Sequence, residues 1–335
     1  MLNLLNMDND QLGTLIEQSS LETGLPHAII EKDFWVCYLL DYLFNRSSFR
    51  NSLIFKGGTS LSKAYGLIER FSEDIDLILD WRLLGYGIDE PWEQRSNTKQ
   101  NTFTRETIGR TNAFLSQTFI PEIKTGIERE LAIDVDIRMS TAEETVLFAY
   151  PKLFSHEATL DIIRLEIGPL AAWTPSEPTT ITSYIAELYP HLFEQASCNC
   201  ITALPERTFW EKATILHQEA NRPGDKAMPR RYARHYYDMF KLGHSSVLNK
   251  ALVQAELLSH VVAFKEKFYR TPWAHLSSAT IGTIKLAPQT SRLQELESDY
   301  TAMQAMIFGN APSFLEIVSY MAELQDMINS TARQR

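Results

Sequence analysis

Residues 53–61 read LIFKGGTSL and residues 72–77 read SEDIDL, and these two stretches decide how the chain folds. The apolar run Leu53 to Phe55 predicts a short buried strand. Two glycines then break the strand, and the spacing of apolar residues from Leu61 onward predicts a helix. Residues 74–79, DIDLIL, predict a second strand. The pattern indicates a strand, a glycine turn, a helix and a further strand.

The glycine turn has the composition of a phosphate-binding corner. Gly57 and Gly58 have no side chains, so a ligand can approach the main chain closely. The start of a helix favours anions, and Ser60 adds a hydroxyl donor at the same corner. A Gly-Gly turn also occurs where no ligand binds, so a second feature of the sequence is needed to support a phosphate-binding site.

The second signal is the pair of aspartates in the following strand. Alternate residues of a strand share a face, so Asp74 and Asp76 point the same way, and Ile75 and Leu77 point into the core. Two like charges on one face repel unless a cation lies between them. Mg²⁺ binds one or two carboxylates together with substrate phosphates, so this pair predicts a divalent metal site. The alternative is that both aspartates end an exposed strand in water.

A third carboxylate would complete such a site, and two positions compete for it. Glu166 lies in the apolar run of residues 160–167, where burial of an unpaired charge is costly. Asp134 and Asp136, in the stretch AIDVDIR, form a second pair of the same kind. The residues by themselves leave both possibilities open.

Basic residues gather in the second half of the chain. Lys212 flanks the apolar stripe of a helix that begins at Pro205, where it can reach into a cleft or extend to water. A candidate RNA or triphosphate patch follows within residues 222–234 and consists of Arg222, Lys226, Arg230, Arg231 and Arg234. The alternative is a solvated loop. Arg234 and Asp238 also have the i,i+4 spacing of a local ion pair.

Elsewhere, the first fifty residues show helical spacing, and the polar residues 90–125 predict a long exposed helix. More strand-like runs follow over residues 131–137, 145–150 and 160–167. From about residue 175 the pattern becomes helical. Helices are expected from Pro205, and then over residues 231–242, 246–269, 290–307 and 312–329.

The order of strands followed by helices predicts an α+β protein with a mainly helical second half. The expected parts are N-terminal helices (1–50), a mixed β-sheet with flanking helices (51–175) and a helical C-terminal domain (176–335). The last of these carries Lys212, Arg234 and Asp238.

Composition is that of a globular protein, with 44% hydrophobic and 22% charged residues. The net charge of −10 argues against a protein that coats nucleic acid, although it permits a local basic patch. The three cysteines include no CxxC pair, which predicts neither a disulfide framework nor a zinc knuckle. We find neither a signal peptide nor a membrane-spanning run and expect a cytoplasmic protein.

Taken together, these motifs resemble the AbiEii/AbiGii-type nucleotidyltransferase toxins, which include the MenT toxins and belong to the DNA polymerase β-like superfamily. The similar stretches are GGTSL (57–61), RFSEDIDL (70–77), LEIG (165–168), Lys212 in WEKATILH (210–217) and RHYYDMF (234–240). The segment EKDFWV at residues 31–36 is similar to the family's N-terminal helix.

The resemblance implies a nucleotidyltransferase fold and a role for each matching residue. Lys56, Gly57, Gly58 and Ser60 would bind the NTP, with Lys212 on its phosphates. Mg²⁺ or Mn²⁺ would be held by Asp74, Asp76 and, from the order of motifs, Glu166 in place of Asp134 or Asp136. Asp238 matches a catalytic aspartate of the last motif, but the family often has Arg-Asp where this chain has Arg234-His235.

The implied function is transfer of NMP from an NTP to an acceptor, with release of pyrophosphate. The acceptor expected first is the 3′ end of tRNA, which would block translation by the toxin of a toxin–antitoxin or phage-defence pair. A cognate antitoxin is the expected partner. The alternatives are nucleotidylation of a protein hydroxyl (AMPylation-like), nucleotidylation of a small molecule such as an aminoglycoside, and a non-catalytic binding protein. The preferred NTP and the oligomeric state are left open.

Overall fold

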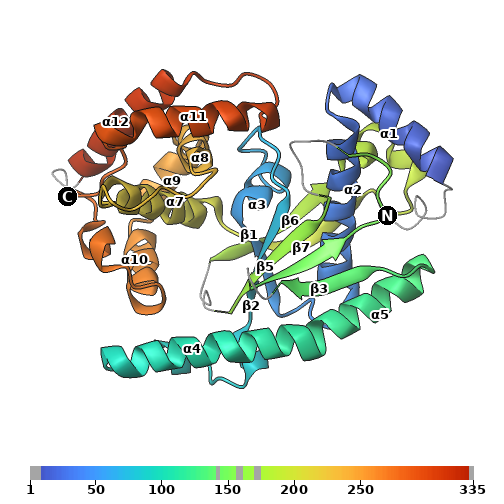
Figure 1. Ribbon diagram of the computed structural model, residues 1–335, viewed down its shortest axis with the longest axis horizontal. Coiled ribbons are helices and arrows are strands. Elements are labelled where there is room, and N and C mark those ends of the chain that lie inside the picture. The colour runs from blue at the N-terminus through green and yellow to red at the C-terminus, as the bar shows by residue number, and fades with distance from the viewer. Residues whose placement is uncertain (1–8, 141–143, 156–160, 170–174, 332–335) are drawn as a thin grey trace. The chain divides into compact units, whose positions relative to one another are not determined.

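The computed structural model describes residues 9–140, 144–155, 161–169 and 175–331 and contains two compact units (Figure 1). Unit 1 contains the described residues of Met1–Ala64 and Phe71–Ala203. Unit 2 contains Tyr65–Arg70 and the described residues of Leu204–Arg335. Residues 65–70, which lie between GGTSL and SEDIDL in the sequence, therefore belong to unit 2, although the residues on both sides of them belong to unit 1.

Unit 1 is built on a seven-stranded mixed sheet with the order β3-β4-β5-β2-β1-β7-β6. The strands are β1 (Leu53–Lys56), β2 (Asp74–Leu79), β3 (Asp136–Ser140), β4 (Thr145–Ala149), β5 (Ile163–Gly168), β6 (Ser176–Thr182) and β7 (Ser197–Ala203). The pairs β2–β5 and β1–β7 are parallel, and the other neighbouring pairs are antiparallel. This confirms the predicted α+β class with a mixed sheet.

The two faces of this sheet differ in burial because apolar and polar residues alternate along its central strands. Phe55, Leu77 and Leu165 are at most 2% exposed and point to one face. Trp35 of helix α2 (His27–Asp41) packs on that same face, with its ring 6.2 Å from the ring of Phe148. The opposite face carries Asp76 and Glu166, which remain accessible. We call this second side the acidic face.

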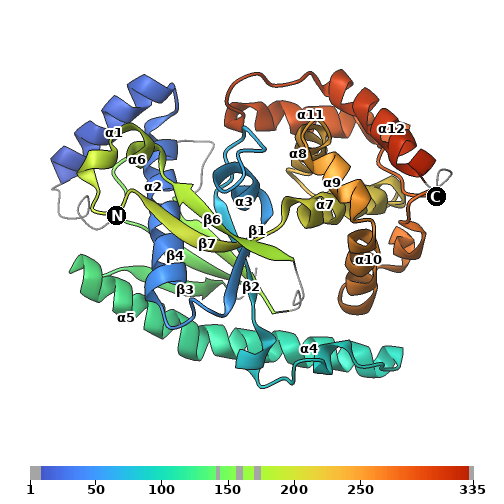
Figure 2. The ribbon, with the colours of Figure 1, turned by 180° about the vertical axis from the view of Figure 1, so that it is seen from behind.

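The helices of unit 1 are α1 (Asn9–Thr23), α2 (His27–Asp41), α3 (Gly57–Lys63), α4 (Asn97–Phe114), α5 (Ile120–Leu131) and α6 (Tyr184–Leu188). A π-helical turn, Leu115–Phe119, joins α4 and α5 into one long helical element, shown in green in Figures 1 and 2. A second π-helical turn, Tyr42–Arg46, extends α2. Helix α2 contacts β7, and its buried stripe of apolar residues confirms the predicted N-terminal helix.

Two parts of unit 1 differ from the sequence-based expectation. The strand predicted over residues 131–137 begins only at Asp136, because the amphipathic helix α5 continues to Leu131 and ends where Ala132 adopts a left-handed conformation. The helical pattern expected from residue 175 is wrong up to residue 203. Strands β6 and β7 pair there along their whole length, and Pro178 is accommodated because β6 is an edge strand.

The described residues of unit 2 form helices and connecting loops, with one isolated β-bridge between Arg70 and Ile307. Its helices are α7 (Pro205–Ala220), α8 (Ala233–Gly243), α9 (Val247–Val253), α10 (Glu256–Phe268), α11 (Leu293–Met303) and α12 (Phe314–Ser330). Helix α7 contacts α8, α9 and α10 and forms the centre of the unit. The N–H of Phe308 donates to the Glu69 carbonyl at 2.7 Å, which ties the segment 65–70 to this unit.

No single helix within the described residues has the length and apolar character needed to cross a membrane. The pair α9 and α10 meets the criteria of length and composition only when its two helices are taken together, and they are bent by 81°.

Candidate active site

The glycine turn at the end of β1 lies directly against Asp76, one of the candidate metal ligands. Strand β1 ends at Lys56, and Gly57 has a φ of +81°, a conformation that favours glycine. A Cβ atom on Gly57 would overlap the carboxylate of Asp76 and lie 2.9 Å from its Cβ. The absence of a side chain at Gly57 therefore lets the Asp76 carboxylate rest on the main chain of the turn. Lys56 and Asp76 are also register partners on β1 and β2.

Two hydroxyls hold this turn together from inside. Thr59 donates from Oγ1 to the carbonyls of Ser72 and Asp74, which links α3 to the start of β2. Ser60 is completely buried and donates from Oγ to the Gly57 carbonyl at 2.9 Å. The hydroxyl of Ser60 thus bonds within the turn, and its donation to a phosphate stays a prediction.

The carboxylates of the acidic face lie side by side on two parallel strands. Asp76 of β2 is the register partner of Glu166 of β5, and Asp74 is the register partner of Arg164. Arg164 Nε lies 3.8 Å from Asp74 Oδ1, so a cation already balances the charge of Asp74 in part. Glu166 is exposed, and Asp74 and Asp76 are half-buried. The sheet thus brings the three predicted carboxylates to one face.

Asp134 and Asp136, the rival positions for the third carboxylate, lie elsewhere on the sheet. Asp136 is on the edge strand β3, separated from β2 by β4 and β5, and it is paired with Arg138. Asp134 is exposed just before that strand. The register therefore places Glu166, and not the second aspartate pair, beside Asp76.

The donor set of the acidic face suits a hard cation, because carboxylate oxygens are the ligands that Mg²⁺ prefers. Among the described residues, no three His, Cys, Asp or Glu side chains come together closely enough to hold one metal ion. Asp76 and Glu166 fit a metal as a neighbouring pair, with substrate phosphates supplying further oxygens.

Three consecutive charged residues of α2 brace the elements that carry this site, and the sequence indicated them only through the family resemblance. Glu31, Lys32 and Asp33 are each at most 2% exposed, between the apolar runs 28–30 and 34–40 of the helix. Successive residues on a helix point about 100° apart. The three side chains therefore reach three different parts of unit 1.

Lys32 and Asp33 each form a buried ion pair. Lys32 Nζ lies 2.6 Å from Glu73 Oε2, one residue before Asp74. Asp33 Oδ1 lies 2.9 Å from Lys63 Nζ at the end of α3, and Asp33 Oδ2 accepts from the N–H of Tyr184 at 2.8 Å. Burial by itself lowers the pKa of Lys63, but the Asp33 carboxylate more than offsets this and raises it above its ordinary value. Helix α2 is therefore bonded to both motif elements, α3 and β2.

Glu31 makes the third connection. Its carboxylate accepts from the N–H groups of Leu153 and Phe154 at 2.6 and 2.9 Å, in the loop after β4. Burial raises the pKa of Glu31, and these two backbone donors offset part of the rise. The sequence signal for all three residues is a charged triplet between apolar runs, since such charges must find partners when the helix is buried.

Lys212, Asp238 and Arg70 form a separate buried cluster in unit 2. Asp238 has no exposed surface and accepts from Arg70 Nε and Nη2 at 2.7 and 2.8 Å. Lys212 Nζ lies 2.7 Å from Asp238 Oδ2. Burial tends to raise the pKa of Asp238, but the charges of Arg70 and Lys212 hold it well below its usual range. This geometry allows Asp238 to position Lys212, and the catalytic role implied by the resemblance stays a prediction.

The burial of Lys212 explains why its ammonium group needs the carboxylate of Asp238 as a partner. Burial lowers the pKa of Lys212, and the attraction of Asp238 offsets only part of that effect. Arg70, the first residue of the stretch RFSEDIDL (70–77), had no predicted role. Asp238 pairs with Arg70 and Lys212 and not, as its spacing suggested, with Arg234.

The residues of the predicted basic patch fall into two groups. Arg222 is buried, with Nε 2.6 Å from Glu219 Oε2 and its guanidinium 4.9 Å from the ring of Trp273. It therefore stabilises α7 and is not part of an exposed patch. Lys226, Arg230 and Arg231 are exposed, and Arg234 is half-buried. These four remain candidates for contact with an anionic partner.

Comparisons with known proteins give one family match and several solved structures. A family model described as "Nucleotidyl transferase AbiEii toxin, Type IV TA system" matches residues 38–324. Among solved structures, JHP933 from Helicobacter pylori matches with 15% identity and a TM-score of 0.43, over 92% of this chain and 95% of that one. MenT4, a nucleotidyltransferase toxin from Mycobacterium tuberculosis, matches with 14% identity and a TM-score of 0.45, over 95% and 99%. No curated protein matches the chain.

Proposed function

The chain belongs to the AbiEii family of nucleotidyl transferase toxins of type IV toxin–antitoxin systems, and from that premise we propose how its site acts and which acceptor it modifies. The protein is a nucleotidyltransferase. In our proposal it transfers NMP from an NTP to the 3′ end of tRNA and so blocks translation. The observation that carries the site assignment is the register of Asp76 with Glu166, beside the Gly57 turn.

The proposed reaction is an in-line displacement at the α-phosphorus of the NTP. The acceptor hydroxyl oxygen forms the new P–O bond, the bond between the α-phosphorus and the bridging oxygen breaks, and pyrophosphate leaves. Bound Mg²⁺ or Mn²⁺ would neutralise phosphate charge and stabilise the attacking and leaving oxygens. Asp76 and Glu166 would hold the metal together with Asp74, and Glu166, the most exposed of the three, would also accept the proton of the acceptor hydroxyl.

The second unit supplies the residues of the later motifs. We infer that Asp238 and Arg70 fix the ammonium of Lys212, because Asp238 is fully buried and bonded to both. Contact of Lys212 with the substrate phosphates, where it would offset charge on the leaving pyrophosphate, stays a prediction that follows from the family motif.

The exposed cations among residues 226–234 support RNA as the acceptor, because they form a basic stretch in a chain of net charge −10. Phosphate contacts make binding depend on salt, with a slope in log Kd against log salt of about 0.7–0.9 per contact. The double variant Lys226→Glu/Arg230→Glu is expected to weaken tRNA binding and reduce that slope. Lys250→Glu, whose side chain is 63% exposed on α9 of the same unit, is the matched control.

The family implies a cognate antitoxin as partner. Action in the cytoplasm and a role in phage defence are part of the same proposal, since a toxin that modifies tRNA must act where translation occurs.

The experiment that tests the function supplies each NTP, labelled at the α-phosphate, to purified tRNA and to a protein fraction in separate reactions. Transfer to tRNA by the natural chain, and none by Asp76→Asn, is the expected result. Label in the protein fraction alone would favour the AMPylation-like alternative. Label in an added aminoglycoside alone would favour small-molecule modification.

A further inference from the structure

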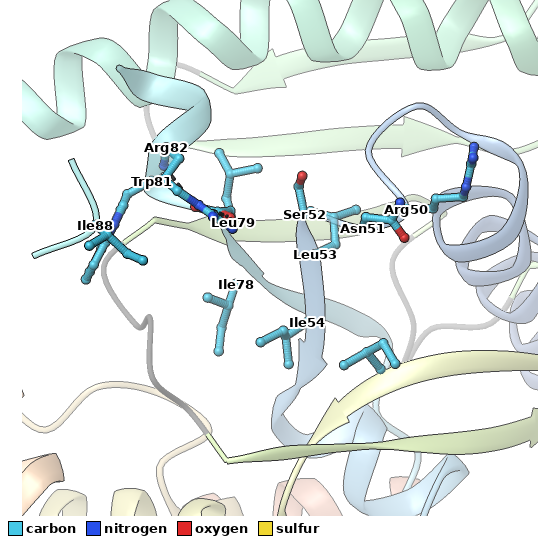
Figure 3. Close-up of a pocket in the computed structure, with 12 residues that line it drawn as sticks. Arg50, Asn51, Ser52, Leu53, Ile54, Ile78, Leu79, Trp81, Arg82 and Ile88 are labelled. Atoms are coloured by element: carbon cyan, nitrogen blue, oxygen red, sulfur yellow. Dashed lines mark hydrogen bonds and ion pairs between the residues drawn. The ribbon is translucent and has the colours of Figure 1, made fainter. Parts of the chain in front are cut away.

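The acidic face continues beyond the carboxylates into a pocket that the proposed chemistry does not use. The pocket has a volume of about 510 Å³ and lies at the end of β1 and β2 that is remote from the glycine turn (Figure 3). Its floor contains Ile54, Ile78 and Ile201, and its rim contains Arg50, Asn51 and Arg82. All these residues belong to unit 1.

The register of the sheet places this floor next to the metal-ligand candidates. Ile54 and Ile78 are register partners, as are Lys56 and Asp76 two residues further along the same strands. Residues two apart on a strand share a face and are separated by about 7 Å. Figure 3 shows Ile54 and Ile78 pointing the same way from neighbouring strands. The floor and the Asp76 carboxylate are therefore adjacent on one surface.

Strand β7 extends the floor sideways. Phe55 is the register partner of Thr202, so Ile54 lies beside Ile201. Ile201 is 39% exposed and Ile88, also in the lining, is 50% exposed. Several large aliphatic side chains on one concave surface favour a ligand with a flat apolar face. The polar rim consists of Arg50, Asn51, Ser52 and the ion pair of Arg82 with Asp80, and these groups can meet the polar edge of such a ligand.

We propose that this pocket binds the nucleobase of a substrate nucleotide and so contributes to the choice of nucleotide. A nucleobase has two flat apolar faces and a polar edge, which match an aliphatic floor and a polar rim. The proposal rests on the proposed function, because it requires Asp76 to belong to the catalytic site. Only then does a ligand in this pocket lie within the length of one nucleoside from the reacting phosphate. The base belongs either to the incoming NTP or to the terminal nucleotide of the acceptor.

Binding can be measured without catalysis by saturation-transfer NMR with AMP, GMP, CMP and UMP, and with ribose 5-phosphate as a probe that lacks a base. We expect transfer from the protein to the base protons in the natural chain. Ile201→Ser should weaken base binding by roughly tenfold, since apolar contact area is lost. Ile201→Trp should also weaken it by filling the pocket. Ile108→Ser is the matched control, because Ile108 is likewise 39% exposed in unit 1 but lies on α4.

Steady-state kinetics separate the two sources of the base. A raised KM for NTP and reduced discrimination among the four NTPs in Ile201→Ser would assign the pocket to the incoming nucleotide. A raised KM for the acceptor alone would assign it to the acceptor. Equal base signals and equal KM values in the natural chain, Ile201→Ser and Ile201→Trp would overturn the proposal.

Asp76→Asn distinguishes this proposal from the proposed function. It should abolish transfer and retain the base signals of the natural chain. A natural chain that binds bases in the pocket but transfers no nucleotide would contradict the function and leave the pocket supported. A natural chain that transfers nucleotide without any base signal from the pocket would contradict the pocket alone.

Discussion

The buried ammonium of Lys32 lies 2.6 Å from the carboxylate of Glu73, the residue that immediately precedes Asp74 on the acidic face. Glu73 and Asp74 are neighbours in the chain, so their side chains point to opposite sides of the sheet. Glu73 thus faces α2, and Asp74 faces the open side. The ion pair fixes the start of β2 from within the core and leaves the metal-ligand candidates on the surface.

Lys32→Met is expected to destabilise the fold by about 3–5 kcal/mol, because it leaves the Glu73 carboxylate buried without its ammonium partner. Urea unfolding followed by circular dichroism measures the loss. The double variant Lys32→Met/Glu73→Leu should recover most of it, since an apolar pair removes the uncompensated charge. Lys124→Met, which removes an exposed pair with Glu128, should change stability by less than about 1 kcal/mol. Equal effects of Lys32→Met and Lys124→Met would contradict the bracing role.

Gly57→Ala is expected to abolish nucleotidyl transfer, because the added Cβ displaces the Asp76 carboxylate. Gly24→Ala is the matched control: Gly24 has a similar φ of +73° and no atom within 4 Å of its Cβ position. Gly24→Ala should therefore lower the free energy of unfolding by only the about 1–2 kcal/mol that an alanine in the left-handed conformation costs, and it should retain activity. The rate of α-labelled NTP transfer, together with the thermal midpoint, measures both effects. Full activity of Gly57→Ala would show that the turn does not seat Asp76.

Glu166→Gln is expected to reduce kcat by a factor of at least about 100, whether Glu166 accepts the proton or binds metal. Asp136→Asn should leave kcat unchanged, because Asp136 lies on the edge strand β3 and pairs with Arg138. Transfer rates measured at several Mg²⁺ concentrations test both variants. A large loss of kcat in Asp136→Asn with no loss in Glu166→Gln would assign the third carboxylate position to the second aspartate pair.

Asp238→Asn is expected to destabilise the protein by about 3–5 kcal/mol at pH 7, since it leaves Arg70 and Lys212 buried without their counter-charge. The pKa of Asp238 is lower in the folded protein than its ordinary value of 3.8. Its stabilisation is therefore fully present above pH 3.8 and is lost as the pH falls through the folded pKa. The difference in unfolding free energy between the natural chain and Asp238→Asn should be constant from pH 7 to pH 5.

Below pH 4 that difference should shrink, and urea unfolding at steps between pH 3 and pH 7 measures it. Asp136→Asn is a control, because the side chain of Asp136 is 55% exposed and its ion pair is screened by solvent. A difference that stays constant down to pH 3 would contradict the proposed charge state of Asp238.

The sequence by itself determined the local parts of this protein. The glycine turn after β1, the alternation of Asp74 and Asp76 with apolar residues, and the helix that begins at Pro205 follow from turn chemistry and hydrophobic period. These depend only on residues close together in the chain. They were sufficient to predict an α+β protein, its paired carboxylates and, through the resemblance, its family.

Tertiary structure alone decided which distant residues meet. Glu166 is beside Asp76 because β5 pairs with β2 in one register, and a shift of one residue would point it to the other face. The pairing of β6 with β7, the Lys32–Glu73 bond and the Arg70–Asp238 bond likewise join residues far apart in the chain. A charged residue in a buried segment indicates that it needs a partner, but only the packing of the whole chain determines which residue that partner is.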